Sequence, residues 1–458
     1  MITDKIYKVP CIYPIQNPKK AQEVLKVKVP GSKSITNRAL LLATLAEGKT
    51  ILKGVLFSDD SRHFLKCIQE LGFETVVDEE NCIVEVTGHG GKVPKQEAFP
   101  YVGSAGTAAR FLSAYLGVCK GIYHMDASEQ MRKRPMAPLL ECLQELGCEI
   151  SYEGREGYFP FTLKGNGFGK DTISVDIEHS SQFLSALLIA SSLADQDMHI
   201  QVVGTHGMAY IEMTIAMMQQ FGVQVIKQPD GSYVIPSGQK YNGGAYQIEP
   251  DMSAASYFYA MTPLLGIPVQ VEHITYQSLQ GDIQFLSVLE KMGCSVKEDP
   301  AGLIVYPPKA VAEDSINVIG TEVSAKFPGI DIDMSSFSDQ AITVAAIAPF
   351  AASPTRISGI GHIRFQECDR MSAIITELGK MGIRCESTES EITIYPGDPG
   401  ASLVETYDDH RMAMGFSLVG LRAEEIQISN PGCCKKTFEN YFECLDACVR
   451  KIVEKKKI

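Results

Sequence analysis

The sequence predicts an α/β fold assembled from one short unit that is repeated along the chain. Helical stretches with apolar residues three and four positions apart end in glycine at intervals of about 70 to 90 residues. After each glycine the periodicity changes from helical to alternating, which is typical of two short strands joined by a turn. The 458 residues exceed what one hydrophobic core usually serves, so we expect two domains.

The helices that end in glycine are amphipathic. The clearest one runs from Met371 to Gly382, and its apolar side chains include Ile374 and Leu378. Glycine suits the left-handed residue that closes many helices. Similar patterns occupy residues 64–72, 136–147, 211–222 and 286–293.

A second set of helices is apolar nearly all round, which predicts that these helices are buried. They occupy residues 34–45, 107–116, 181–193, 253–265, 339–351 and 410–421. The repeated unit is therefore strand, buried helix, strand, amphipathic helix, strand, strand, and it occurs about six times.

Composition and charge exclude several classes of protein. The net charge of −13 argues against non-specific nucleic-acid binding. The longest uncharged apolar stretch, residues 341–352, is too short to span a bilayer, and the N-terminus lacks a signal-peptide core. The 13 cysteines, Cys433 and Cys434 included, show no paired metal spacing. We therefore expect a cytoplasmic protein with free thiols and no metal site, which binds neither membrane nor nucleic acid.

The buried helices begin with unusual residues. Serine and aspartate at these positions are explained by capping of the free N–H groups. Capping does not explain Lys33, Arg110 and Arg411, because cations oppose the positive end of a helix dipole. Cations at helix N-termini indicate that an anion balances them, and several such ends together predict an anion-binding cleft.

Eight segments, in this order and spacing, carry a resemblance to a known family. They are Pro30–Arg38, Ser104–Arg110, Arg134–Pro135, Ser180–Phe183, Gln280–Asp282, Glu367–Arg370, Asp408–Met414 and Lys436–Phe438. From about residue 27 to residue 445 the chain resembles the 5-enolpyruvylshikimate-3-phosphate synthase family of enolpyruvyl transferases. The resemblance implies two similar domains, each of three βαβαββ units around a pseudo-threefold axis, an arrangement called an inside-out α/β barrel.

The resemblance also implies domain boundaries and a reaction. One domain would hold residues 1–31 and 250–458, the other residues 32–249, with the active site in the cleft between them. The enzymes of this family join the 5-hydroxyl of shikimate 3-phosphate to C2 of phosphoenolpyruvate and release phosphate, through a tetrahedral intermediate. The reaction belongs to the shikimate pathway to chorismate and the aromatic amino acids. It needs no metal or organic cofactor, and we expect a monomer.

The matched positions imply roles for individual residues. Those matching phosphoenolpyruvate-binding residues are Lys33, Gly106, Arg134, Gln182, Arg370, Arg411 and Lys436. Those matching shikimate-3-phosphate-binding residues are Lys33, Ser34, Arg38, Ser180, Ser181, Gln182, Tyr210, Asp339, His362 and Gln366. Asp339 is the candidate base for the hydroxyl, and Glu367 and Lys33 are the candidates for proton transfer at C3 and at the departing phosphate. The residue types fit, because guanidinium groups pair bidentately with carboxylate and phosphate.

The chain departs from the commonest family pattern mainly on the acceptor side. Ser104 stands where asparagine is common, and Gly207 stands where many members have serine, so that Thr205 or His206 would have to supply a hydroxyl or imidazole instead. His362 and Gln366 replace an asparagine and a lysine. The phosphoenolpyruvate side is nearly complete, so this donor is better supported than shikimate 3-phosphate as acceptor.

Three alternatives to this acceptor or activity stay open. The UDP-N-acetylglucosamine enolpyruvyl transferases share the fold, but they carry a reactive cysteine before an Arg-Pro, and residues 126–134 contain none. A diverged enzyme could act on another shikimate-like acid. A binding protein without turnover would be expected to lose Asp339, Glu367 or an arginine, all of which are present. Gly106 should leave room for glyphosate, whereas Phe111, where proline is frequent, leaves the sensitivity open.

Overall fold

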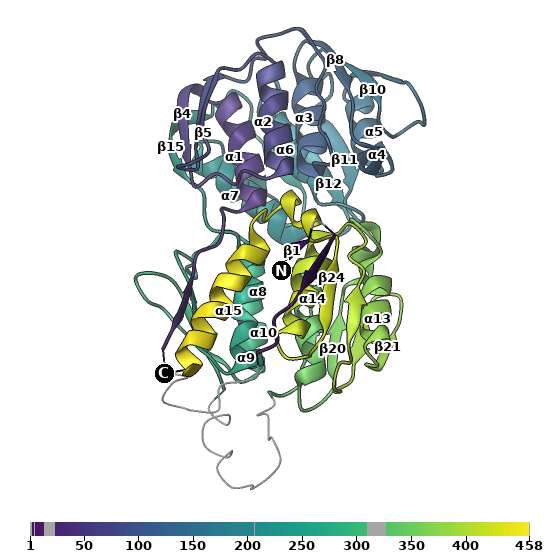
Figure 1. The fold of residues 1–458 in the computed structure, drawn as a ribbon. Helices are drawn as coiled ribbons and strands as arrows, with labels where there is room; N and C mark the ends of the chain where they lie inside the picture. The colour runs from purple at the N-terminus through teal and green to yellow at the C-terminus, as the bar shows by residue number, and fades with distance from the viewer. Residues whose placement is uncertain (1, 4, 13–22, 206, 309–326, 458) are drawn as a thin grey trace, which may run out of the picture. The chain divides into compact units, whose positions relative to one another are not determined.

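The computed structural model describes residues 2–3, 5–12, 23–205, 207–308 and 327–457. By its internal contacts the chain forms two compact units (Figure 1). Unit 1 contains Met1–Pro30 and Pro250–Ile458, and unit 2 contains Gly31–Glu249. Each unit is described by itself below.

Unit 2 holds three four-stranded sheets within its described residues. The first is β15 (Asn242–Gln247), β4 (Glu47–Lys53), β6 (Ile83–His89) and β5 (Thr75–Asp78). The second is β7 (Glu97–Ala98), β8 (Gly121–Met125), β10 (Phe161–Gly165) and β9 (Glu149–Tyr152). The third is β11 (Thr172–Asp176), β12 (Met198–Val203), β14 (Tyr233–Ile235) and β13 (Ile226–Lys227).

Unit 1 also holds three four-stranded sheets in the part of it that is described. The first is β1 (Ile2–Thr3), β2 (Ile6–Lys8), β24 (Ile426–Ser429) and β23 (Ser402–Val404). The second is β17 (Ser295–Lys297), β18 (Ile304–Tyr306), β16 (Val269–Val271) and β3 (Leu25–Val27). The third is β19 (Asp331–Asp333), β20 (Thr355–Ser358), β22 (Ile392–Ile394) and β21 (Cys385–Ser387).

All six sheets share one topology. Each contains one parallel pair, such as β11 with β12, and two antiparallel pairs, such as β12 with β14 and β14 with β13. A parallel pair requires a crossover, whereas an antiparallel pair can be a hairpin. Three sheets join strands that are far apart in the sequence, because β15 pairs with β4, β3 with β16, and β2 with β24. The predicted α/β fold of repeated βαβαββ units is confirmed.

The buried helices begin where the sequence predicts them. In unit 2 they are α1 (Lys33–Leu45), α3 (Gly106–Val118) and α6 (Gln182–Ser191). In unit 1 they are α8 (Met252–Tyr259) continued by α9 (Met261–Leu265), α12 (Ala341–Ile347) between the 3₁₀ turns η4 (Ser338–Gln340) and η5 (Ala348–Phe350), and α14 (His410–Gly420). Every residue of α3, α8, α12 and α14 is buried. Such helices form the interior of each unit.

The amphipathic helices cover the outside of the sheets and helices. They are α2 (Asp59–Glu70), α5 (Ala137–Glu145), α7 (Met208–Gln220), α10 (Phe285–Lys291), α13 (Arg370–Lys380) and α15 (Tyr441–Lys457). The glycines that follow five of them have positive φ, as predicted for left-handed closing residues. They are Gly72, Gly147, Gly222, Gly293 and Gly382.

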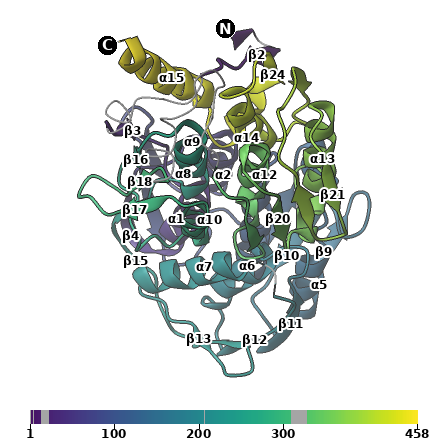
Figure 2. The same cartoon turned by 90° about the horizontal axis from the view of Figure 1, so that it is seen from below.

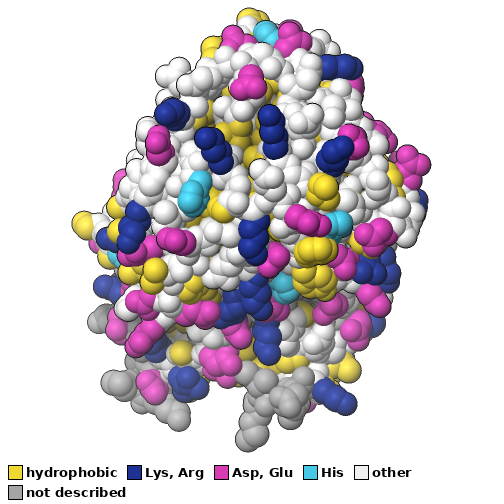
Figure 3. All heavy atoms as spheres, turned by 90° about the horizontal axis from the view of Figure 1, so that it is seen from above, with side chains coloured by type: hydrophobic (Ala, Val, Ile, Leu, Met, Phe, Trp, Pro, Cys, Tyr) yellow, Lys and Arg dark blue, Asp and Glu magenta, His cyan; other side chains and the backbone are white. Residues whose placement is uncertain are grey.

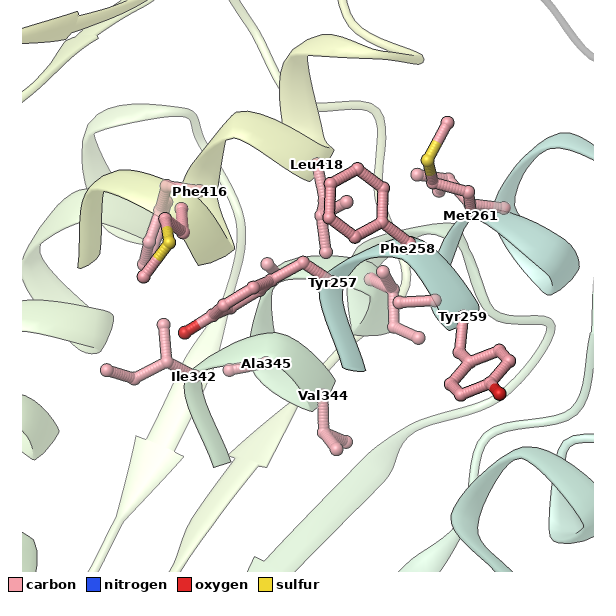
Figure 4. Packing of buried hydrophobic residues seen from close by; sticks show 14 of the residues in the cluster. Tyr257, Phe258, Tyr259, Met261, Ile342, Val344, Ala345, Phe416 and Leu418 are labelled. Atoms are coloured by element: carbon pink, nitrogen blue, oxygen red, sulfur yellow. The ribbon is translucent and has the colours of Figure 1, made fainter. Parts of the chain in front are cut away.

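In the core of unit 1, α8, α12 and α14 pack against one another (Figures 2 and 4). Tyr257 and Phe258 of α8, Ile342 of α12 and Phe416 of α14 are at most 1% exposed. The α12–α14 contact is close, since a Cβ on Gly415 would lie 2.6 Å from Cγ2 of Ile342. This packing fixes the N-termini of the three helices, which carry the polar residues considered below.

The described surface is mixed in charge. Lysine and arginine side chains are interspersed with aspartate and glutamate on the face drawn in Figure 3. None of the helices within the described ranges has both the length and the apolar composition of a membrane span. Nor do three histidine, cysteine, aspartate or glutamate side chains meet as potential metal ligands in those ranges.

The packing of α14 on α12 gives a stability prediction. Gly415→Ala places a methyl group against Ile342 and should lower the free energy of unfolding by about 1 to 3 kcal/mol, as overpacking of a core does. Gly379→Ala is the matched control at an exposed position of α13, where a Cβ would meet nothing within 4 Å. It should leave stability unchanged or raise it by up to about 1 kcal/mol. Urea unfolding of both variants checks this, and equal effects would contradict the packing argument.

Candidate active site

The first predicted site residues lie at the start of α1 in unit 2. Ser32 caps the helix through a hydrogen bond from the Ile35 N–H. A Cβ on Gly31 would lie 1.9 Å from the Gly54 carbonyl oxygen, so only glycine fits before the cap. Lys33 is the first helical residue, and its Nζ lies 3.6 Å from Oδ2 of the buried Asp60. The local sequence thus places an ammonium group at a helix N-terminus.

Arg38 is buried one turn further along α1, and its charge is held by uncharged groups. It donates to Thr214 Oγ1 at 2.7 Å and to the carbonyl oxygens of Ser34 and Tyr210 at 3.0 and 3.2 Å. Its guanidinium carbon lies 5.2 Å from the centre of the Phe111 ring. Burial lowers the pKa of Arg38 to about 10, so the group is still cationic at neutral pH. A buried cation with neutral acceptors makes this region attractive to an anion.

Two arginines lie against Gly106 at the start of α3. Arg110 donates to the Gly106 carbonyl oxygen at 3.2 Å and to the Pro135 carbonyl oxygen at 3.1 Å. A Cβ on Gly106 would lie 2.8 Å from Nη1 of Arg110 and 2.9 Å from Nη1 of Arg134. Arg110 therefore connects the Arg134–Pro135 segment to α3. Because Gly106 has no Cβ, both guanidinium groups can lie close to its backbone.

The start of α6 brings together three more predicted residues. Ser180 Oγ accepts a hydrogen bond from the Gln182 N–H at 3.3 Å, and Ser181 is the N-cap. Gln182 Oε1 is buried and has no hydrogen-bond partner among the described residues. A buried acceptor without a partner is costly, and a ligand that donates a hydrogen bond would satisfy it.

The structure gives a backbone reason for Gly207. Its φ is 65°, a left-handed value that favours glycine, and a Cβ there would lie 2.5 Å from Ser181 Oγ. The Ser181 hydroxyl thus occupies the space that a serine at position 207 would need. Thr205 is exposed, and His206 lies outside the described residues.

In unit 1, Arg370 is the centre of a buried ion network. It is the first residue of α13 and 1% exposed. Its Nε lies 2.8 Å from Asp409 Oδ2, its Nη1 3.1 Å from Asp339 Oδ1, and its Nη2 2.9 Å from Glu367 Oε2. Nη1 also donates to Gln366 Oε1. Burial would lower the pKa of Arg370, but the three carboxylates raise it above the ordinary arginine value.

Two further cations complete this network. Arg411, the second residue of α14, lies 2.8 Å from Asp339 through Nη2 and Oδ2. Lys436, at the end of the 3₁₀ helix η7 (Pro431–Lys436), lies 3.0 Å from Glu367 through Nζ and Oε1. Cations and carboxylates therefore alternate along one chain, which we call the ion chain: Lys436, Glu367, Arg370, Asp339, Arg411. All five residues were predicted site residues.

Asp409 also belongs to the ion network around Arg370, although the sequence analysis did not single it out. It is fully buried, accepts a hydrogen bond from the Arg411 N–H at 2.8 Å as the cap of α14, and also binds Arg370. From sequence alone it reads as a capping residue. The available signal was the pair of acids directly before a helix whose first turn carries an arginine.

The segment Gln280–Asp282 lies behind the ion chain. Gln280 holds the residues before α8, because its Oε1 accepts from the Met252 N–H at 2.9 Å and its Nε2 donates to the Pro250 carbonyl at 2.8 Å. Asp282 Oδ2 accepts a hydrogen bond from the Ser253 hydroxyl, and Arg411 Nη2 donates to Ser253 Oγ at 3.4 Å. Burial raises the pKa of Asp282 to about 7, assisted by the charge of Asp339 and opposed by that of Arg411.

Two histidines of unit 1, His362 and His410, lie beside these residues. His362 Nε2 is 2.6 Å from Ser338 Oγ, one residue before Asp339. His410 Nδ1 is 3.7 Å from Asp409 Oδ1. The predicted residues thus divide into two sets, and the set in unit 1 lies around Arg370. The set in unit 2 lies near helix N-termini and contains Lys33, Ser34, Arg38, Gly106, Arg134, Ser180, Ser181, Gln182 and Tyr210.

Fold and residues together define a class of protein. The inside-out α/β fold of βαβαββ units presents cations and hydroxyls at the N-termini of buried helices, an arrangement suited to small anionic metabolites. The family model of EPSP synthase (3-phosphoshikimate 1-carboxyvinyltransferase) matches residues 18–445. The chain therefore belongs to the EPSP synthase family.

Individual relatives agree with this assignment. The chain is 42% identical over 417 residues to a 3-phosphoshikimate 1-carboxyvinyltransferase of Nostoc punctiforme, covering 91% of this chain and 94% of the relative. It is 39% identical over 424 residues to one of Vibrio atlanticus, covering 92% and 96%. A solved structure of EPSP synthase from Acinetobacter baumannii has the same fold, with a TM-score of 0.78 and 24% identity over 97% of this chain and 98% of that one.

Asp282 gives a prediction about pH. Its folded-state pKa is raised from 3.8 to about 7, so the folded protein binds a proton that the unfolded chain releases between these values. The stability contributed by Asp282 is present below pH 4 and is lost as the pH rises through 7. Asp282→Asn stays neutral, so relative to the wild type it should gain on the order of 2 kcal/mol in the free energy of unfolding between pH 5 and pH 8.

Urea unfolding at the two pH values measures this gain. Asp195→Asn, at an exposed position of unit 2, is the matched control and should show the same difference from wild type at both. A pH-independent effect of Asp282→Asn would contradict the raised pKa.

Proposed function

We propose that this chain transfers the enolpyruvyl group of phosphoenolpyruvate to the 5-hydroxyl of shikimate 3-phosphate, giving 5-enolpyruvylshikimate 3-phosphate and phosphate. The products lead to chorismate and the aromatic amino acids. The ion chain is the observation that carries the proposal, because it sets two carboxylates between three cations. Family membership supports the same reaction. The proposed protein is a cytoplasmic monomer without a metal or organic cofactor, and it binds neither nucleic acid nor membrane.

The cations are suited to hold two anionic substrates. In the proposal, Lys33, Gly106, Arg134 and Gln182 of unit 2 and Arg370, Arg411 and Lys436 of unit 1 bind phosphoenolpyruvate. The guanidinium forks pair with its carboxylate and phosphate. Ser34, Arg38, Ser180, Ser181 and Tyr210 of unit 2, with Asp339, His362 and Gln366 of unit 1, bind shikimate 3-phosphate.

The carboxylates of the ion chain are suited to move protons. Asp339 takes the proton of the 5-hydroxyl while the hydroxyl oxygen forms a bond to C2 of phosphoenolpyruvate. The C2–C3 double bond opens and C3 gains a proton, which gives the tetrahedral intermediate. Breaking the C2–O bond to phosphate and removing one C3 proton then restores the double bond. Glu367 and Lys33 are the groups proposed for the C3 proton and for the departing phosphate. The cations stabilise the anionic charge throughout.

A different acceptor is the second candidate. The observation that favours it is the place of Gln366, whose Oε1 accepts from Arg370 where family members commonly have a lysine. A neutral amide there supplies one positive charge fewer for a phosphorylated acceptor.

Phosphate release from purified protein tests both candidates. With phosphoenolpyruvate we expect release when shikimate 3-phosphate is added and none with UDP-N-acetylglucosamine or unphosphorylated shikimate. Release with another acceptor alone would replace the proposed acceptor. Binding of both ligands without release of phosphate would contradict the proposed enzymatic activity and indicate a binding protein.

Gly106→Ala gives a prediction for the donor side. The added methyl group would lie within 3 Å of the Arg110 and Arg134 guanidinium groups and must displace them. We therefore expect the KM for phosphoenolpyruvate and the inhibition constant of glyphosate to rise about tenfold or more, as loss of charged contacts does. Steady-state kinetics measure both constants.

Gly154→Ala is the matched control for that measurement. It lies in the same unit, and a Cβ there would meet nothing within 4 Å. Its constants should equal those of the wild type. Unchanged inhibition in Gly106→Ala would remove Gly106 from the proposed phosphoenolpyruvate site.

A further inference from the structure

Helix α13 carries a further buried charged residue, Glu377, on the C-terminal side of Arg370. Glu377 is seven residues after Arg370, which places both on one face of the helix. Glu377 is fully buried. Its Oε1 accepts from the Tyr407 hydroxyl at 2.8 Å, its Oε2 accepts from the Glu405 N–H at 3.1 Å, and Lys380 Nζ lies 2.5 Å from Oε2. A buried carboxylate thus holds the loop that precedes α14.

This loop has an unfavourable backbone. Tyr407 and Asp408 have φ values of 54° and 55°, so two consecutive residues with a Cβ adopt the left-handed conformation. Such conformations persist only where surrounding contacts stabilise them. The loop needs this turn, because the next residue, Asp409, is the cap of α14 and a partner of Arg370.

The same loop is tied to the segment that carries Lys436. Asn430 Nδ2 donates to Asp408 Oδ1 at 3.1 Å, and Asn430 itself has a φ of 44°. Strands β23 and β24 are parallel neighbours, so the loops that follow them leave the same edge of the sheet. One loop leads to Arg411 and the other to Lys436.

We propose that Glu377, Tyr407 and Asn430 are positioning residues, which hold the left-handed turn at Tyr407–Asp408 so that Asp409, Arg370, Arg411 and Lys436 keep their geometry. None of the three is a predicted substrate contact. The proposal rests on the proposed function, because the cations it positions are the proposed phosphoenolpyruvate site. It predicts an effect on phosphoenolpyruvate binding that is larger than the effect on stability.

Variants of Tyr407 test the proposal. Tyr407→Phe removes only the hydroxyl and should raise the KM for phosphoenolpyruvate about tenfold, with a smaller change in kcat and in the KM for shikimate 3-phosphate. Tyr407→Ala and Tyr407→Gly both remove the whole side chain, but glycine adopts a φ of 54° without strain. The glycine variant should therefore bind phosphoenolpyruvate more tightly than the alanine variant. A Tyr407 side chain that merely touched the substrate would give equal losses.

Two further variants complete the experiment. Glu377→Gln keeps one acceptor, so its KM for phosphoenolpyruvate should lie between those of the wild type and Glu377→Ala. Tyr395→Phe is the matched control. The Tyr395 hydroxyl also donates to a glutamate of unit 1, Glu386 Oε2 at 3.0 Å, but this hydrogen bond is exposed. This variant should behave as the wild type. Thermal unfolding shows whether each variant is folded, and Tyr407→Phe remains decisive where a truncation does not fold.

The outcomes separate this proposal from the proposed function. A wild-type KM for phosphoenolpyruvate in folded Tyr407→Phe, or equal values for the glycine and alanine variants, would overturn the positioning role while leaving the reaction in place. A wild type that releases no phosphate from the two substrates would overturn the proposed function. In that case equilibrium binding of phosphoenolpyruvate to the same variants still tests the positioning role.

Discussion

The arrangement of unit 1 depends on the pairing of Arg370 with three carboxylates. A buried guanidinium without partners would cost several kcal/mol, and a buried carboxylate without partners would cost as much. The fully buried Asp409 therefore depends on Arg370, and Arg370 is balanced further by the half-buried Asp339 and Glu367, each of which has a second cation as partner. These residues come from three separate segments, so the pairing fixes α12, α13 and α14 relative to one another at their N-termini. The packing of α8, α12 and α14 below them supplies the rigid base.

The two units use charge differently. In unit 2 the buried Arg38 is held by a hydroxyl and two carbonyl oxygens, which leave its positive charge uncompensated by those contacts. In unit 1 each cation of the ion chain faces a carboxylate. The first arrangement attracts anions strongly, and the second can exchange an internal carboxylate for an anion of a substrate. A carboxylate that loses its cation becomes a better proton acceptor, which suits the role proposed for Asp339.

Sequence reasoning predicted what depends on local pattern. The buried helices, the closing glycines and the cations at Lys33 and Arg411 follow from periodicity and from the helix dipole. It missed Asp409 and Glu377, because each looks like an ordinary helix residue until the fold brings Arg370 or Tyr407 to it. It assigned Gly207 a missing hydroxyl, whereas the backbone angle and the nearby Ser181 explain the glycine. Long-range contacts decide these cases, and one sequence does not reveal them.

The closing of sheets by distant strands has a consequence for synthesis on the ribosome. All strands of unit 2 lie within one continuous stretch, so its sheets can form as soon as that stretch has emerged. In unit 1, β2 pairs with β24 across more than four hundred residues, and β3 pairs with β16. Strand β2 must therefore wait, with one unpaired edge, until residues 426–429 have been made, and β3 must wait for residues 269–271. The last unit to become complete is the one that carries the three paired cations.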